Sequence, residues 1–161
     1  MNIVLIGMMG SGKTSVGKKL SKLLSYEFVD TDEHIERGQE MSITDIVNSK
    51  GEEYFRNIES DIISEISKNS NTIISTGGGC ILKSENIMNL KENGDIWYLK
   101  CSLNEISKRI QRNDTRYLLY NTSISKIYDD RENLYQEYSD YTVDCSKKSI
   151  DDICGEIINN E

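Results

Sequence analysis

Residues 7–14 form a glycine-rich string whose residue types and spacing suit phosphate binding. The string Gly7-Met8-Met9-Gly10-Ser11-Gly12-Lys13-Thr14 matches the pattern G-x-x-x-x-G-K-[ST] in full. Its glycines let the backbone curl so that successive N–H groups point at phosphate oxygens, and the dipole of a helix that begins there favours an anion. Lys13 is expected to meet the β- and γ-phosphates and Thr14 to offer its hydroxyl to Mg²⁺. We therefore predict a nucleoside triphosphate site, with Gly10, Ser11, Gly12, Lys13, Thr14 and Ser15 as its binding residues.

The nucleotide is predicted to be ATP. The chain has no Asn-Lys-x-Asp string of the kind that reads guanine, and it has no dinucleotide pattern G-x-G-x-x-G apart from the phosphate loop. These two absences favour an ATP-using protein over a GTPase or a dehydrogenase.

Further polar groups fall near the ends of two other predicted strands. Asp30 and Asp32 close a strand at 27–30, Gly77–Gly79 follow a strand at 72–76, and Arg56 lies on a helix between them. Ligands of a parallel sheet gather at the carboxyl ends of its strands. One carboxylate can serve Mg²⁺ while the other orients a hydroxyl and accepts its proton, although an Asp in this position is also a common helix N-cap.

Four arginines flank or follow an irregular polar stretch at 112–122. They are Arg109, Arg112, Arg116 and Arg131. An arginine on a flexible segment can close over a transferring phosphate and neutralise its developing charge. Any one of them is equally well explained as a solvated surface residue.

The elements that must position these groups alternate between strand and helix. Short apolar strands are predicted at 2–6, 27–30, 72–76, 96–99 and 141–143, the last as an edge strand. Helices are predicted after residue 12, from Ser42, through 55–66, over 84–92 with a stop at Asn93-Gly94, around 103–111, from Ser123 and from Ser149. This alternation predicts an α/β fold of three layers, α/β/α, around a five-stranded parallel sheet.

Length and composition limit the classes of protein. A chain of 161 residues that is 37% hydrophobic predicts one domain over 1–161, and a net charge of −8 argues against nucleic acid as a partner. No apolar run reaches the roughly 18 residues of a membrane span, and the N-terminal segment lacks the features of a signal peptide. The four cysteines contain no Cys-x-x-Cys pair, so we expect them to be reduced and buried in a cytoplasmic protein.

Six strings, in this order, resemble those of the shikimate kinase family along nearly the whole chain. They are the phosphate loop, Asp30-Thr31-Asp32, Gly51-Glu52-Glu53-Tyr54-Phe55-Arg56, Gly77–Gly79, Arg116-Tyr117-Leu118-Leu119, and Arg131 with Leu134-Tyr135. The resemblance implies a fold of the P-loop kinase type with a mobile lid at about 110–123 and a substrate-binding helical part at about 31–60. It also implies a monomer that transfers the γ-phosphate of ATP to the 3-hydroxyl of shikimate, in a step towards chorismate and the aromatic amino acids.

The resemblance also implies roles for single residues. Lys13, Asp32 and Arg116 would be catalytic, with Asp32 as the base and Arg116 reaching from the lid to the ATP phosphates. Shikimate would be bound by Asp32, Arg56, Gly77, Gly78, Gly79 and Arg131, the two arginines holding its carboxylate. Arg109 would stack near the adenine, and Thr14 and Asp30 would serve Mg²⁺.

The chain departs from the family pattern at the lid. Tyr117 stands where the family has proline, and the stretch between Leu119 and Arg131 is short, so we expect altered lid closure more than altered substrate choice. Two alternatives remain at this point: another small-molecule kinase, acting on gluconate or a nucleoside monophosphate, and a non-catalytic ATP-binding module.

Overall fold

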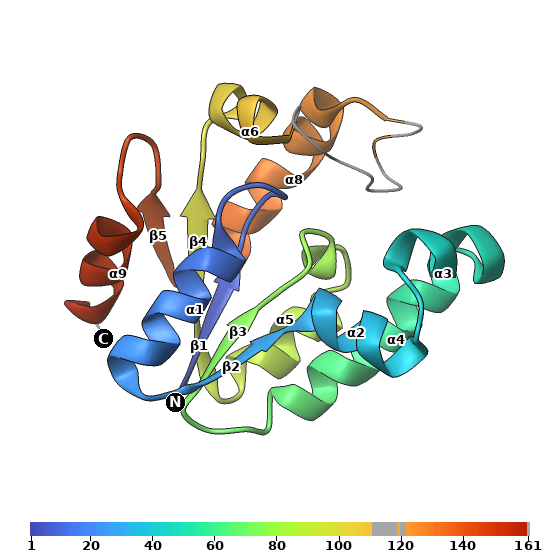
Figure 1. Ribbon diagram of the computed structural model, residues 1–161, viewed down its shortest axis with the longest axis horizontal. Helices are drawn as coiled ribbons and strands as arrows, with labels where there is room; N and C mark the ends of the chain where they lie inside the picture. Colours follow the sequence, from blue (N-terminus) through green and yellow to red (C-terminus); the bar gives the residue numbers. More distant parts are fainter. Residues whose placement is uncertain (111–118, 120–121, 161) are drawn as a thin grey trace.

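A five-stranded sheet, parallel throughout, lies at the centre of the computed structural model, which describes residues 1–110, 119 and 122–160 (Figure 1). The strands are β1 (Asn2–Ile6), β2 (Glu27–Asp30), β3 (Thr72–Ser75), β4 (Gly94–Lys100) and β5 (Tyr141–Asp144). Their order is β2-β3-β1-β4-β5, so β5 is an edge strand as predicted. Central strand β1 pairs with β3 and β4, and all five of its residues are buried, which explains its uninterrupted apolar sequence.

Helices cover both faces of this sheet, and the predicted three-layer α/β/α architecture is confirmed. They are α1 (Lys13–Leu24), α2 (Thr31–Gln39), α3 (Ile43–Lys50), α4 (Glu52–Ile66), α5 (Ser84–Lys91), α6 (Leu103–Ile110), α8 (Ile124–Tyr138) and α9 (Ile150–Ile158), with a short 3₁₀ helix η1 (Cys80–Leu82). Alternate residues of β1 point into two separate cores. Ile3 and Leu5 pack with α1 and α9, whereas Val4 and Ile6 pack with α4, α5 and α8.

Serine and aspartate begin several helices in this proline-free chain. Ser42, Ser123 and Ser149 accept backbone N–H hydrogen bonds at the starts of α3, α8 and α9, and Ser149 and Asp152 form a capping box. Each such cap contributes about 1 kcal/mol to helix stability. The predicted helix starts at 42, 123 and 149 are therefore confirmed.

Helices α2, α3 and the start of α4 lie beside the sheet, on the right in Figure 1. Ile35, Ile46 and Phe55 bury a small core of their own between them. The segment 31–60 is therefore helical, as predicted, and its core is separate from the two cores of the sheet.

The structure corrects one local prediction. Asp32 does not close strand β2, because β2 ends at Asp30 and Asp32 lies in the first turn of α2. Helix α5 ends at Lys91, near Asn93-Gly94 as predicted, and Gly94 is also the first residue of β4. A Cβ at Gly94 would lie 3.1 Å from both Cβ and O of Asn2, so close strand packing explains this glycine.

Three further predictions concern the state of the cysteines, a membrane-spanning helix and the position of the lid. All four cysteines are buried and free, as expected. In the described part of the chain, no helix has the length and apolar character needed to cross a membrane. The predicted lid at 110–123 falls mostly outside the described residues, but Ile110 and Leu119 pack against the core that contains Val4.

Candidate active site

One large cavity lies at the carboxyl ends of β1, β2 and β3, where a parallel sheet is expected to bind its ligands. Its volume is about 870 Å³, and it is lined by the phosphate loop, the starts of α1 and α2, helix α4, the loop after β3 and the start of α9. The cationic side chains among its described lining residues are Lys13, Arg56, Arg109, Arg131 and Lys148. The chain carries a net charge of −8, so these cations form a local basic region inside an acidic molecule.

The phosphate loop curls between β1 and α1, as its glycines predict. Gly10 and Gly12 have φ angles of 76° and 100°, in the region that disfavours residues with a Cβ. Gly12 is the N-cap of α1 and supplies no side-chain cap, and the start of a helix favours an anion. Lys13 is buried and donates to the carbonyls of Gly7 and Met8 at 2.8 and 2.9 Å, which holds its ammonium inside the loop.

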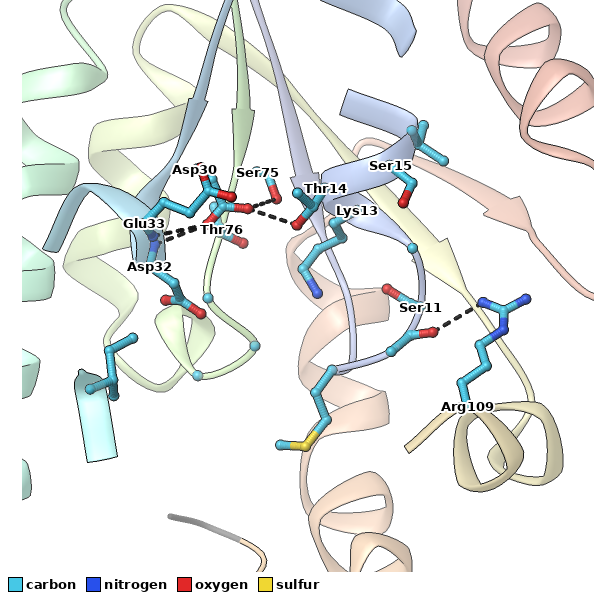
Figure 2. A pocket seen from close by; sticks show the side chains of 18 of the residues that line it. Ser11, Lys13, Thr14, Ser15, Asp30, Asp32, Glu33, Ser75, Thr76 and Arg109 are labelled. Atoms are coloured by element: carbon cyan, nitrogen blue, oxygen red, sulfur yellow. Dashed lines mark hydrogen bonds between the residues drawn. The ribbon is translucent and has the colours of Figure 1, made fainter. Parts of the chain in front are cut away.

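Asp30, at the end of β2, connects the start of α1 to the end of β3. One carboxylate oxygen caps α2 by accepting the N–H groups of Asp32 and Glu33, and the other accepts the hydroxyls of Thr14 at 2.7 Å and Ser75 at 3.0 Å (Figure 2). The sequence offered two interpretations of Asp30, a helix N-cap and a carboxylate of the site. The structure shows that Asp30 caps α2 and also lines the cavity. Because Thr14 donates its proton to Asp30, the lone pairs of its oxygen are available to a metal ion.

Asp32 lies at the start of α2, and its carboxylate faces the loop after β3. A Cβ at Gly77 would lie 2.5 Å from Oδ1 of Asp32, so only glycine allows this approach. Figure 2 shows the side chains of Asp32 and Lys13 extending toward the centre of the cavity from its two sides. A carboxylate and a phosphate-binding ammonium therefore face the same space.

The triple-glycine loop brings backbone N–H groups to the cavity. Gly77 donates its N–H to the Thr31 hydroxyl at 2.9 Å, and Thr76 anchors the start of the loop to the Leu5 carbonyl. Within the described part of the chain, no acceptor takes the N–H of Gly78 or Gly79. Two donors that find no acceptor among the described residues, in a loop that lines the cavity, are suited to oxygen atoms of a ligand.

Arg56 is held at the cavity wall by two carboxylates from its own helix. Its guanidinium pairs with Glu59 at 2.7 Å and with the half-exposed Glu52 at 3.5 Å. Glu59 is completely buried; burial raises its pKa, and the charge and hydrogen bond of Arg56 oppose that rise. A Cβ at Gly79 would overlap the Arg56 guanidinium, so Gly79 and Arg56 lie against each other.

Arg131 and Arg109 approach the cavity from α8 and α6. Arg131 is 6% exposed, and its Nη1 has no hydrogen-bond partner among the described residues. Arg109 donates to the Gly10 carbonyl at 3.0 Å (Figure 2), which places it beside the phosphate loop. Arg131 is thus a nearly buried cation with donor capacity to spare, and Arg109 lies at the nucleotide end.

All the predicted site residues that the structure describes line this single cavity. They are Gly10, Ser11, Gly12, Lys13, Thr14, Ser15, Asp30, Asp32, Arg56, Gly77, Gly78, Gly79, Arg109 and Arg131. The predicted residues Arg116 and Tyr117, and the candidate Arg112, lie outside the described residues.

Sequence reasoning missed several residues of the site. The sequence pattern marks Ser75 only as part of a strand, although a polar residue at a strand's carboxyl end is a usable signal. Glu59 stands three residues after Arg56 among apolar neighbours, which is a signal for a buried ion pair. Ile150 and Ile153 of α9 also line the cavity, and nothing in their local sequence marks them.

Comparisons with known proteins decide the family. A family profile described as shikimate kinase matches residues 9–160. The chain belongs to the shikimate kinase family. It is 40% identical to a shikimate kinase from Caldanaerobacter subterraneus subsp. tengcongensis, over 98% of this chain and 94% of that protein.

Solved structures agree with this assignment. A shikimate kinase from Acinetobacter baumannii in complex with shikimate superposes with a TM-score of 0.93 and 32% identity, covering 99% of this chain and 91% of that one. A gluconokinase from Sinorhizobium meliloti reaches a TM-score of 0.58 at 18% identity, covering 98% of this chain and 89% of that one, which shows a similar fold only. Membership of the shikimate kinase family therefore favours shikimate over gluconate, the alternative left open by the sequence.

Proposed function

We propose that this shikimate kinase family member transfers the γ-phosphoryl group of ATP to the 3-hydroxyl of shikimate, giving shikimate 3-phosphate and ADP. The observation that carries the proposal is the arrangement of the cavity. A phosphate loop with its lysine and a facing carboxylate, Asp32, share one space with two nearly buried arginines, Arg56 and Arg131. Such a space suits a small hydroxylated carboxylic acid beside a nucleoside triphosphate.

The nucleotide is assigned to the end of the cavity formed by Gly10–Ser15 and Arg109. The N–H groups at the start of α1 and the Lys13 ammonium would bind the phosphates. Arg109, fixed beside Gly10, is proposed to stack near the adenine, and the apolar side chains of Ile150 and Ile153 would line the base site. Lys13 must exchange its carbonyl contacts for phosphate oxygens when ATP binds.

Shikimate is assigned to the opposite end. Among the cations of the described lining, Lys13 and Arg109 contact the phosphate loop, whereas Arg56 lies against Gly79 of the triple-glycine loop. Arg131 is nearly buried, and its Nη1 has no hydrogen-bond partner among the described residues. The substrate carboxylate is therefore assigned to Arg56 and Arg131. A guanidinium binds a carboxylate through paired N–H groups, at roughly 1.5–3 kcal/mol for each charge-assisted bond. The N–H groups of Gly78 and Gly79 add donors beside these arginines.

Asp32 is proposed as the base. Its carboxylate would accept the proton of the 3-hydroxyl as the oxygen attacks the γ-phosphorus and the bond to the β,γ-bridging oxygen breaks, leaving ADP. The chain forms no covalent bond with the substrate in this step, so its contribution is positioning and charge neutralisation. Arg116, proposed from the family resemblance alone, would add a positive charge near the ATP phosphates.

Thr14 and Asp30 fit a magnesium ion. Both offer oxygen atoms, which Mg²⁺ prefers, and the hydrogen bond between them directs a lone pair of Thr14 outward. No group of three or more His, Cys, Asp or Glu side chains suited to a metal ion occurs among the described residues. Such a sparse site is typical of Mg²⁺ that keeps waters and binds substrate phosphates. Bound there, the ion would neutralise charge on the β- and γ-phosphates.

The cellular setting is proposed to be the cytoplasm, with the chain acting as a monomer. Four buried free cysteines support a reducing compartment. The described walls of the cavity supply groups for both substrates from a single chain, which supports catalysis without a second copy.

An ADP-release assay across shikimate, gluconate and nucleoside monophosphates tests the proposal. We expect shikimate alone to stimulate ADP release, with a dependence on both substrates. Release stimulated by gluconate or a nucleoside monophosphate instead would identify another small-molecule kinase. ATP binding without acceptor-dependent release, in a preparation shown to be folded, would identify a non-catalytic module.

A further inference from the structure

The hydroxyl of Tyr135 lies where helix α8 meets the phosphate loop and the triple-glycine loop. The side chain is completely buried, and its ring stacks on Tyr98 of β4 with centroids 5.2 Å apart. The hydroxyl donates to the carbonyl oxygen of Gly78 at 2.5 Å and lies 3.9 Å from the sulfur of Met8 in the phosphate loop. Burial raises the pKa of this phenol, so it remains a donor at neutral pH.

The same helix carries Arg131, one turn before Tyr135. Residues four apart on a helix lie on the same face, so the two side chains are neighbours. The charge of Arg131 opposes the rise that burial causes in the Tyr135 pKa. Tyr135 therefore connects the helix that holds a substrate-facing arginine to the triple-glycine loop. A side chain that only filled core space would not need a polar atom at this point.

The Gly78 carbonyl belongs to the same planar peptide unit as the Gly79 N–H. In a trans peptide, the C=O and N–H bonds point in opposite directions, so a hydrogen bond that fixes one fixes the other. Tyr135 holds the Gly78 carbonyl, and the Gly79 N–H therefore points away from Tyr135. This N–H has no acceptor among the described residues, and Gly79 lies against Arg56.

We infer that Tyr135 is a positioning residue that fixes the Gly78–Gly79 peptide so that the Gly79 N–H meets the substrate carboxylate beside Arg56. The inference rests on the proposed function, because it assigns the carboxylate to that end of the cavity. Tyr135 is not among the residues that line the cavity, and it acts through its contact with Gly78. Without its hydroxyl, this peptide is free to rotate, since glycine on both sides imposes little restraint.

The test compares Tyr135→Phe with Tyr98→Phe. Phenylalanine retains the ring, its volume and the stack, so both variants are expected to fold, which the melting temperature checks. Tyr98 is the matched control because its buried hydroxyl has no hydrogen-bond partner among the described residues. We expect Tyr135→Phe to raise KM for shikimate about tenfold, the effect of one hydrogen bond to a charged group, and to change KM for ATP less than about twofold. Tyr98→Phe should change neither.

A second substrate separates positioning from general damage to the fold. The methyl ester of shikimate keeps the ring and hydroxyls but has no carboxylate charge. Tyr135→Phe should lower kcat/KM about tenfold for shikimate and less than about twofold for the ester, each relative to the wild-type chain. Equal losses for both substrates, or shikimate and ATP parameters within about twofold of the wild type, would overturn the inference. A wild-type chain that releases no ADP with shikimate would overturn the proposed function itself, a result distinct from either of these.

Discussion

The hydroxyl of Thr14 donates to the carboxylate of Asp30 at 2.7 Å, joining the first turn of α1 to the end of β2. Ser75, from the end of β3, donates to the same carboxylate oxygen. Three elements that are distant in the sequence thus meet on one side chain, which also caps α2. This arrangement links the magnesium ligand proposed at Thr14 to the helix that carries the proposed base.

Replacing Asp30 with asparagine should weaken the response to magnesium. The variant removes a negative charge and one of two acceptor oxygens, while asparagine remains a good N-cap for α2. We expect Asp30→Asn to raise the Mg²⁺ concentration for half-maximal activity about tenfold, with little change in melting temperature. Asp45→Asn is the control, because Asp45 accepts the Ser42 hydroxyl at the start of α3, away from the nucleotide. An unchanged magnesium dependence would remove Asp30 from the metal site.

Lys13→Ala should abolish turnover and leave the fold intact. The ammonium is the phosphate-facing cation of the loop, so its loss is expected to lower kcat at least about 10³-fold. Circular dichroism and the melting temperature would check the fold, and Lys18→Ala on the exposed side of the same helix is the matched control. Turnover near that of the wild-type chain in Lys13→Ala would refute the assigned mechanism.

Asp32→Asn should separate the two substrates kinetically. The amide has nearly the same shape but cannot accept a proton as a base, so kcat should fall about 10²–10⁴-fold. KM for ATP should remain within about twofold, because Asp32 lies across the cavity from the phosphate loop. Steady-state kinetics with each substrate varied in turn measures both values. Unaltered kcat would exclude Asp32 as the base.

Glu59 should make the stability of the protein depend on pH. Its folded-state pKa is raised above the ordinary value of 4.5, chiefly by burial, so the folded state holds this proton more tightly than the unfolded state does. The Glu59 contribution to the free energy of unfolding is therefore fully present below pH 4.5 and falls as pH rises through the raised pKa. The loss amounts to about 1.4 kcal/mol for every pH unit that separates the folded and unfolded pKa values.

Urea unfolding across this pH range tests the direction. Glu59→Gln carries no titrating proton at this position. As pH increases, the free energy of unfolding of the wild-type chain should therefore fall relative to that of the variant. The exposed Glu65 on the same helix provides the control, Glu65→Gln. A difference that stays constant with pH, or moves the other way, would contradict the assigned pKa.

Local patterns in the sequence predicted much of the fold. Five apolar strands, the serine caps and the phosphate loop are encoded in residues close together, so periodicity and motif spacing identify them. Contacts between residues that are distant in the sequence were not predicted. Gly94 is a glycine because Asn2 packs against it from another strand, which no local pattern shows.

The candidate site also combines residues that local sequence identifies with residues that only the tertiary structure identifies. Lys13, Thr14 and the triple glycine are recognisable from local strings, and the family resemblance adds roles for Asp32, Arg56 and Arg131. Tertiary contacts are not recognisable in this way. The family string marks Tyr135, but it does not show that the Tyr135 hydroxyl reaches Gly78, 57 positions away. No string shows that Ile150 reaches the cavity from the C-terminal helix.

The position of the phosphate on the product tests the central claim most directly. After incubation of the chain with shikimate, ATP and Mg²⁺, a proton–phosphorus correlation spectrum identifies the carbon that bears the new phosphomonoester. We predict a correlation between the phosphorus and the proton on carbon 3 of shikimate. A correlation with the proton on carbon 4 or carbon 5, or no phosphorylated shikimate at all, would contradict the account.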